Sequence, residues 1–198
     1  MKENKVFVIG FHKTGTSSLY MALRQLGYSV CDVRHIRDLD LSERSWPVLQ
    51  GLINDYDAFR EQPWPSFFRR IYEYRPLSKF VLTIRPTEAW LASATRYFGA
   101  RTNAKRQAIY GAGSPIGHES AYAERYERHN REVIQFFADK PESLLVMDLA
   151  AGAGWRELCA FLAKNTPVAC DFPHRSPDRM RGGRKAGRQN KSVGKHGE

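Results

Sequence analysis

The sequence has few cysteines and no long apolar run, and each shortage excludes a class of protein. Its three cysteines, Cys31, Cys159 and Cys170, are widely spaced and form no CxxC pair. Such a set fits neither a disulfide framework nor a cysteine-based zinc site, and it predicts a reducing, cytoplasmic compartment. No apolar run approaches the roughly 20 residues that a membrane-spanning helix needs. We therefore expect a cytoplasmic protein without a membrane span.

Acidic residues are also in short supply, and the excess of basic ones is concentrated at one end. The 198 residues carry a net charge of +10, but residues 175–198 alone hold eight Lys or Arg against two acidic residues. That segment therefore has a net charge of +6, which leaves +4 for residues 1–174. Because it has few apolar side chains to bury, we expect a basic, mostly disordered tail over 175–198 and one folded domain over 1–174.

Short apolar runs alternate with stretches of helical periodicity. Strands are predicted at 5–9, 29–33, 79–84 and 144–147, and helices at 19–26, 43–53, 66–74, 87–98, 119–137 and 155–163. This alternation predicts an α/β fold, a three-layer single domain in which helices flank a parallel sheet. Residues 99–117 contain four glycines and little periodicity, so they are predicted to form a loop or a lid.

The segment between the first predicted strand and the first helix has the character of an anion-binding loop. It reads Gly-Phe-His-Lys-Thr-Gly-Thr-Ser-Ser over residues 10–18. Glycines at both ends permit a tight turn with inward N–H groups, and the helix start adds a partial positive charge. Lys13 supplies a full charge. A capped helix start alone would not need this lysine, so phosphate binding is the favoured interpretation.

The loop differs from the common ATP-binding sequence, in which lysine follows the second glycine. Here Lys13 precedes Gly15. The difference counts against an ordinary nucleoside triphosphatase, although a nucleotide kinase or NTPase with a variant loop remains the alternative. The strand over 144–147 ends in Asp148, as a Walker B strand does, but an aspartate at a strand end is common and more often structural.

A second phosphate-binding candidate follows the strand predicted at 79–84. Arg85 lies at the end of that strand, and Ser93 comes eight positions later within a predicted helix. An arginine at the carboxyl edge of a parallel strand points into the crevice where α/β ligands bind, and its fork matches a phosphate. The alternative is that Arg85 pairs with a surface carboxylate and Ser93 packs in the helix.

Together the two motifs resemble those of sulfotransferases that use 3′-phosphoadenylyl sulfate (PAPS), in particular small bacterial-type members with a P-loop-like fold. The likeness extends over residues 5–174 and includes GFHKTGTSSL and the Arg/Ser pair, whose usual Arg-Asp-Pro form is shortened here to Arg-Pro. The resemblance implies sulfuryl transfer from PAPS by in-line displacement, with no metal. It implies donor-binding roles for these residues: His12, Lys13, Thr14, Gly15, Thr16, Ser17, Ser18, Arg85 and Ser93.

The roles of individual residues follow from this resemblance. Lys13 would steady the departing 5′-phosphate, and Arg85 with Ser93 would hold the 3′-phosphate. Glu61, in the stretch Tyr-Asp-Ala-Phe-Arg-Glu-Gln-Pro over 56–63, is the first candidate for general base, and Asp57 is the second. A solvated loop carboxylate is the alternative for either residue.

The sequence does not determine the acceptor, which is expected to be a hydroxyl or amine on a small molecule or carbohydrate. Aromatic residues at helical spacing either shape the acceptor pocket with residues 99–117 or, as is more common, form plain core: Trp64, Phe67, Phe68 and Tyr72. A last alternative is a nucleic-acid-binding protein that acts through the basic tail, with salt-sensitive binding. The body shows no nucleic-acid signature, so we expect no specific nucleic-acid partner. The oligomeric state is left open.

Overall fold

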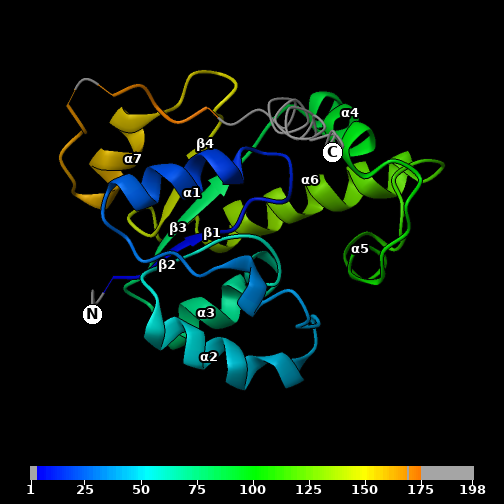
Figure 1. Cartoon of the computed structure of the whole chain (residues 1–198), viewed down its shortest axis with the longest axis horizontal. Helices are drawn as coiled ribbons and strands as arrows, with labels where there is room; N and C mark the ends of the chain where they lie inside the picture. The colour runs from blue at the N-terminus through cyan, green and yellow to red at the C-terminus, as the bar shows by residue number, and fades with distance from the viewer. Residues whose placement is uncertain (1–3, 169, 175–198) are drawn as a thin grey trace, which may run out of the picture.

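The structure, a computed structural model, describes residues 4–168 and 170–174; the predicted tail over 175–198 lies outside them. Four parallel strands form one sheet in the order β2-β1-β3-β4 (Figure 1). Phe7 in the inner strand β1 pairs with Phe59 on one side and Phe80 on the other. The strands are β1 (Val6–Val8), β2 (Ala58–Phe59), β3 (Lys79–Thr83) and β4 (Leu144–Met147).

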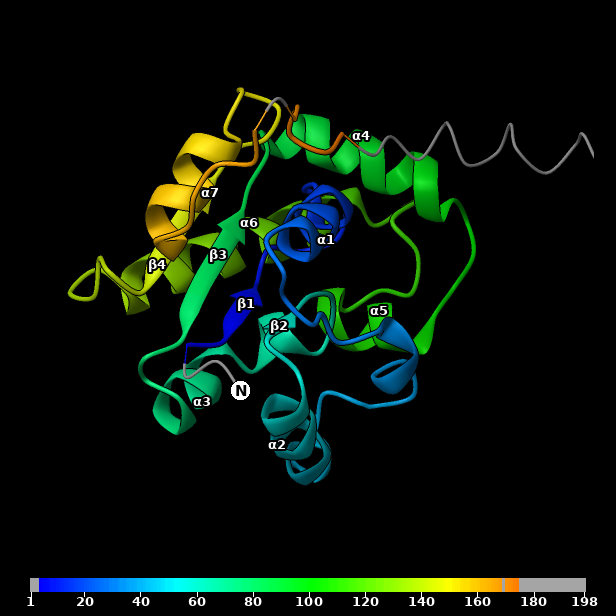
Figure 2. The ribbon, with the colours of Figure 1, turned by 60° about the vertical axis from the view of Figure 1, so that its left-hand side comes forward.

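Helices cover both faces of this sheet (Figure 2). The α-helices are α1 (Thr16–Gln25), α2 (Trp46–Asp55), α3 (Phe68–Tyr74), α4 (Thr87–Phe98), α5 (Ala104–Tyr110), α6 (Glu119–Phe136) and α7 (Trp155–Leu162). Short 3-10 helices are η1 (Val33–His35), η2 (Glu43–Ser45) and η3 (Trp64–Ser66). The predicted helix over 87–98 is thus found at those bounds, and the other predicted helices shift at their ends by a few residues.

Two hydrophobic clusters, one on each face of the sheet, join the sheet to the helices on either side and so form three layers. Alternate residues of β1 point to opposite faces, so that Phe7 packs with α2, α3 and α6 while Val6 and Val8 pack with α1 and α7. Both clusters are rich in side chains that are almost completely buried. The predicted three-layer α/β fold, with a parallel sheet in a single domain, is therefore confirmed.

A third cluster lies where α4, α5 and α6 meet. The ring of Trp90 stacks on Tyr126 at 4.2 Å, and Tyr110 stacks on Tyr122 at 4.1 Å. Trp90 also donates from its indole nitrogen to the backbone oxygen of His12 at 2.7 Å. The cluster thereby joins three helices to the loop that follows β1.

The edge of the sheet differs from the sequence-based prediction. The prediction of a strand over 29–33 was wrong in extent. Only Val30 forms a bridge, to Ala58, and η1 begins at Val33. Instead the short strand β2 occupies that edge, and its neighbours 29–31 run beside it through bonds such as Cys31 N–H to the Ala58 oxygen. Two paired residues are too few to leave a periodic signal.

Residues 99–117 are also more ordered in form than predicted, since they contain α5. The side chain of Asn103 caps this helix by accepting from the Arg106 N–H, and Gly111 ends it with a φ of 76°. The aromatic residues considered for an acceptor pocket are core: Trp64, Phe67 and Phe68 are buried beside the sheet, and Tyr72 packs against them. The commoner interpretation of those four residues was therefore correct.

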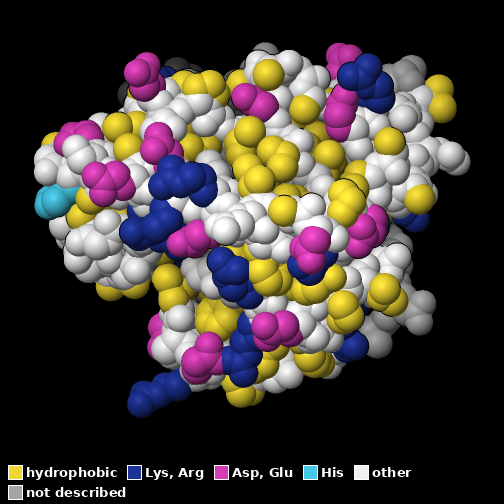
Figure 3. Space-filling model, turned by 180° about the vertical axis from the view of Figure 1, so that it is seen from behind, with side chains coloured by type: hydrophobic (Ala, Val, Ile, Leu, Met, Phe, Trp, Pro, Cys, Tyr) yellow, Lys and Arg dark blue, Asp and Glu magenta, His cyan; other side chains and the backbone are white. Residues whose placement is uncertain are grey.

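No helix that the structure describes is long and apolar enough to cross a membrane. On the face opposite to the view of Figure 1, Lys and Arg side chains alternate with Asp and Glu around a central group of hydrophobic ones (Figure 3). Charge of both signs is thus interspersed on that face.

Candidate active site

The loop between β1 and α1 turns tightly against the neighbouring strand. A Cβ built on Gly10 would lie 2.0 Å from the Thr83 hydroxyl and 2.5 Å from the Thr83 backbone oxygen. Further along, Lys13 and Gly15 have φ of 69° and 103°, in the left-handed region. The two glycines therefore meet different needs: Gly10 permits a close backbone approach, and Gly15 permits an unusual conformation.

Thr14 holds this loop together from within. Its hydroxyl donates to the Phe11 backbone oxygen at 2.6 Å and lies 2.6 Å from the hydroxyl of Thr83, at the end of β3. Thr14 is buried. The Thr14 hydroxyl therefore bonds to the protein itself. Its contribution to the cavity is to fix the conformation of the loop.

Helix α1 begins directly at the loop, with Gly15 as its N-cap and no acidic residue in its first turn. The first N–H groups of a helix have no partners within the helix and carry a partial positive charge. Ser17 lies in this first turn and lines the same cavity as Lys13. The local structure is therefore that of an anion-binding helix start.

Helix α4 presents one face to the loop. Ser93, Arg96 and Tyr97 are spaced i, i+3, i+4 and line the cavity together. The Lys13 ammonium lies 3.9 Å from the centre of the Tyr97 ring, a cation–π geometry. Of these three residues only Ser93 belongs to the predicted motif, although the helical spacing also indicates the other two.

Arg85 follows β3 and is held by α6. Its backbone N–H donates to the Tyr126 hydroxyl at 2.9 Å, and that hydroxyl donates back to the Arg85 oxygen at 2.9 Å. The side-chain Nε is buried and has no hydrogen-bond partner within the described part of the chain. Because an unpaired buried donor is costly, this guanidinium is suited to an anionic ligand in the cavity that it lines.

Glu61 enters the cavity beside the start of α1. Its Oε1 accepts from the Thr16 hydroxyl at 2.7 Å and pairs with the Arg60 guanidinium at 2.9 Å. With a φ of 68°, Glu61 occupies a conformation that non-glycine residues seldom adopt. Because its hydroxyl donates to Glu61, Thr16 links the anion loop to the candidate base.

Asp57 is placed elsewhere. Its Oδ2 accepts from the backbone N–H and the hydroxyl of Ser29, at 3.1 and 2.9 Å. The residue does not line the cavity. Its carboxylate fastens residue 29 to the sheet edge, whereas Glu61 lines the cavity.

His12 lines the cavity from the loop itself. Its Nδ1 lies 3.1 Å from the Tyr110 hydroxyl, and its ring meets Phe98 edge-on at 5.5 Å. Burial lowers the pKa of His12, and Glu61 opposes that shift. The imidazole is consequently favoured in its neutral form close to Glu61.

Two other titratable side chains have structural roles. His129 is buried on α6, 2.7 Å from the Ile9 oxygen and stacked on Phe11 at 4.1 Å. Burial lowers its pKa to about 4. Asp148 accepts from the N–H groups of Ala150 and Ala151 in the turn after β4. Within residues 4–168 and 170–174, no three His, Cys, Asp or Glu side chains come together as a metal site.

A cavity of about 1250 Å³ is lined by the anion loop, Glu61, Arg85 and one face of α4. It brings together every predicted site residue except Asp57: His12, Lys13, Thr14, Gly15, Thr16, Ser17, Ser18, Glu61, Arg85 and Ser93. Its opposite wall consists of residues from 33–41 and from α5. Neither segment carries a motif, so this wall could not be expected from the sequence.

Comparison with known proteins decides the family. A family model described as a sulfotransferase domain matches residues 5–116 and 101–179, which together include the anion loop, Arg85 and α6. The chain belongs to the sulfotransferase domain family. In this sulfotransferase domain, the Arg-Pro form leads straight into a helix, since Pro86 is the N-cap of α4.

One curated relative of this sulfotransferase domain is the Ava biosynthesis cluster protein M of Aspergillus versicolor. It is 29% identical over 106 residues, which cover 45% of this chain and 41% of that protein. The match thus includes less than half of the relative's length.

A solved structure, a sulfotransferase from Alicyclobacillus acidocaldarius, has a similar fold. The TM-score is 0.54 at 17% identity, and the match covers 92% of this chain and 90% of that one. At this identity the likeness concerns the fold alone.

Proposed function

We propose that this chain transfers a sulfuryl group from PAPS to a hydroxyl or amine acceptor. The observation that carries the proposal is the convergence of Lys13, Arg85 and Ser93 on one cavity at the start of α1. To bind a single phosphate, the anion loop alone would be sufficient. A second anion-binding group at the end of the neighbouring strand fits a donor that carries separate 5′ and 3′ phosphates.

The residues present fit such a donor. Lys13 and the first N–H groups of α1 would bind the 5′-phosphate side, where charge develops as that phosphate departs. Arg85, whose buried Nε has no partner among the described residues, would bind the 3′-phosphate together with Ser93. PAPS supplies the activated sulfuryl group.

The chemistry required of the protein is to remove one proton and to align the two reacting groups. In an in-line displacement the acceptor oxygen or nitrogen forms a bond to sulfur as the bond from sulfur to the phosphate oxygen breaks. Glu61 would accept the acceptor proton, because it enters the cavity next to the residues of the anion loop. Arg60 and the Thr16 hydroxyl fix the orientation of its carboxylate.

Calorimetric titration with adenosine 3′,5′-bisphosphate, without magnesium, tests the donor site. We expect clear preference for the bisphosphate over adenosine 5′-monophosphate. Lys13→Ala should abolish binding, and Arg85→Ala should weaken it by about tenfold or more, the loss expected for a charge-assisted hydrogen bond. Lys164→Ala, an exposed lysine beyond α7, is the matched control.

Equal affinity for the mono- and bisphosphate would contradict the proposal. Binding of ATP that depends on magnesium would favour the alternative, a nucleotide kinase or NTPase with a variant loop. Salt-sensitive binding of nucleic acid with no bisphosphate binding would favour the tail-based alternative instead.

A further inference from the structure

The wall of the cavity that faces the anion loop is chemically different from the loop. It comes from the segment 33–41, which includes η1, from the cap residue Asn103, and from residues 104, 105 and 108 of α5. Its apolar members are all aliphatic: Val33, Ile36, Leu39, Leu41, Ala104 and Ala108. Ile36 is buried in the core beneath the wall. The aliphatic surface that the cavity meets therefore comes from the other five, which are partly buried (Val33, Leu39 and Leu41) or exposed (Ala104 and Ala108).

Three of the five polar side chains on this wall form hydrogen bonds within the protein: Asp40, Asn103 and Lys105. Asp40 accepts from the backbone N–H and hydroxyl of Ser42 and from the Ser45 hydroxyl. Asn103 accepts from the N–H of Arg106 as the cap of α5. Arg37 and Asp38 are exposed and lie toward the rim. The interior of the wall therefore offers mainly aliphatic surface to a ligand.

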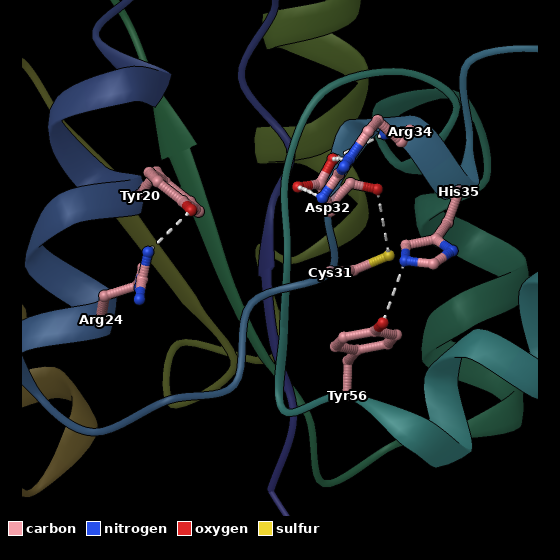
Figure 4. A network of polar contacts seen from close by, with 7 residues as sticks. All are labelled: Tyr20, Arg24, Cys31, Asp32, Arg34, His35 and Tyr56. Carbon is pink, nitrogen blue, oxygen red and sulfur yellow. Dashed lines mark hydrogen bonds and ion pairs between the residues drawn. The ribbon is translucent and has the colours of Figure 1, made fainter.

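The two parts of the wall are joined to each other and to the body. Lys105 on α5 donates to the backbone oxygens of Ile36 and Arg37, at 3.2 and 2.8 Å. At the start of the segment, Asp32 caps η1, and His35 lies 3.1 Å from the hydroxyl of Tyr56 (Figure 4). The aliphatic surface is thus part of a braced structure that exists before any ligand binds.

The volume is sufficient for two ligands. Pockets for one small molecule measure about 300–1000 Å³, whereas this cavity measures about 1250 Å³. A donor bound by Lys13 and Arg85 would leave the space between Glu61 and the aliphatic wall. An acceptor in that space would have its reacting group near Glu61 and its body against the wall.

We propose that the acceptor is an alcohol with an aliphatic body, not a carbohydrate. This inference rests on the proposed function and names its substrate class. The alcohol oxygen forms a bond to sulfur, the bond from sulfur to the donor phosphate oxygen breaks, and Glu61 takes the hydroxyl proton. The products are an alkyl sulfate and adenosine 3′,5′-bisphosphate.

A sugar is disfavoured by the same wall. Each sugar hydroxyl that loses water against aliphatic surface needs a new partner, and an unpaired one is costly. One carboxylate oxygen of Asp40, the amide oxygen of Asn103 and the ammonium of Lys105 are already bonded within the protein. Apolar carbons, by contrast, gain free energy from each methylene that the wall covers.

The test is the affinity of a series of straight-chain alcohols for the full chain saturated with adenosine 3′,5′-bisphosphate. Ethanol, 1-butanol, 1-hexanol and 1-octanol are titrated by calorimetry, with glucose and N-acetylglucosamine as carbohydrate probes. We expect the dissociation constant to fall by about fourfold per added methylene while the chain remains on the wall. Transfer from PAPS to the same alcohols should rise in kcat/KM in the same order.

Ala108→Asp places a carboxylate on the wall at an exposed helical position, so the fold should tolerate it. In this variant the dissociation constant should depend less on the length of the alcohol, and 1-octanol should bind about tenfold or more weakly. The affinity for the bisphosphate should be unchanged. Ala160→Asp, an exposed alanine on α7 outside the cavity, is the control and should behave as the unmodified chain.

Tighter binding of either sugar than of 1-hexanol, or no dependence on chain length, would overturn the inference even if the bisphosphate binds. If the bisphosphate does not bind, the proposed function fails, and the alcohol series on the unliganded chain still tests the wall. A normal chain-length series in Ala108→Asp would likewise show that the alcohols bind elsewhere.

Discussion

Residue 10 is the point at which the anion loop touches strand β3. The space that Gly10 leaves is filled by the backbone and hydroxyl of Thr83, and the same hydroxyl contacts Thr14. One missing side chain thereby permits the strand, the loop and the start of α1 to be held in a single framework.

Gly10→Ala should therefore disrupt both stability and the donor site. The added methyl would meet backbone atoms at 2.5 and 2.8 Å, which cannot move aside as the end of a side chain can. We expect a loss of about 2–4 kcal/mol in the free energy of unfolding, the range for overpacking and backbone strain, and loss of bisphosphate binding. Urea denaturation and calorimetry measure the two effects.

Gly51→Ala is the matched control, with the opposite expected sign. Gly51 lies within α2, and a Cβ there would have nothing within 4 Å. Alanine in a helix interior should stabilise the protein by about 0.5–1 kcal/mol. Equal effects of the two substitutions would contradict the packing explanation.

His129 should make the fold sensitive to acid. Burial lowers its pKa to about 4 in the folded state, whereas an unfolded histidine titrates near 6.5. Between these values the unfolded state binds more protons, so stability is complete above about pH 6.5 and falls as the pH drops toward 4. The total loss from this residue is roughly 3 kcal/mol.

His129→Gln should reduce that dependence, since glutamine can still donate to the Ile9 oxygen but does not titrate. The free energy of unfolding, measured in urea from pH 4 to pH 7, should then fall less steeply with acid. His118→Gln changes an exposed histidine at the start of α6 and should retain the original slope. An unchanged slope in His129→Gln would refute the assignment.

At the scale of elements, α4 and α5 line the cavity from two sides. Helix α4 directs Ser93, Arg96 and Tyr97 toward the anion loop. Helix α5 has only seven residues, and it is held by its cap at Asn103 and by the Lys105 bonds to 36–37. Because so short a helix is not stable alone, its position depends on these contacts.

Lys105→Met should loosen α5 while leaving its apolar stem in place. Two bonds from an ammonium to backbone oxygens are lost, so amide hydrogen exchange in residues 104–110 should become about tenfold faster. Bisphosphate affinity should stay the same, because Lys105 lies on the opposite wall. Lys164→Met is the control, and unchanged exchange in α5 would show that the Lys105 bonds do not hold it.

At the scale of the whole molecule, the proposed donor site joins segments that are distant in sequence. Residues 10–18, Glu61 and the segment 85–97 meet at the carboxyl edge of the sheet, where the parallel strands β1 and β3 both end. A ligand held by all of these segments stabilises the entire fold and not one element.

Adenosine 3′,5′-bisphosphate should therefore raise the melting temperature. At a free concentration of 100 times the dissociation constant, binding adds about 2.7 kcal/mol. For a protein of this size the expected rise is about 5–10 °C. Adenosine 5′-monophosphate at the same concentration should give a smaller rise, and the Arg85→Ala variant should lose most of the effect. A rise that is equal for both nucleotides would argue against a 3′-phosphate site.

From the sequence alone, most of the parallel sheet could be predicted, and the sequence singled out the loop over 10–18 and the pair Arg85 and Ser93, which the structure brings to one cavity. Strands 79–83 and 144–147 and helix 87–98 were found almost where periodicity predicted them, because each is long enough to bury one face. The loop could be identified for a different reason: its glycines, lysine and hydroxyls are contiguous. Local chemistry of this kind is visible in the order of residues.

Three outcomes came from the folded chain and not from local patterns: Glu61 lies in the cavity and Asp57 outside it, the expected strand over 29–33 is reduced to one bridge, and the aliphatic wall is assembled. Those outcomes depend on contacts between residues far apart in the chain, such as Thr16 with Glu61 and Lys105 with Ile36. β2 and α5 are too short to show a period, and their positions are set by neighbours. Long-range packing leaves no local pattern, so the aliphatic wall of the cavity could not be predicted from the sequence.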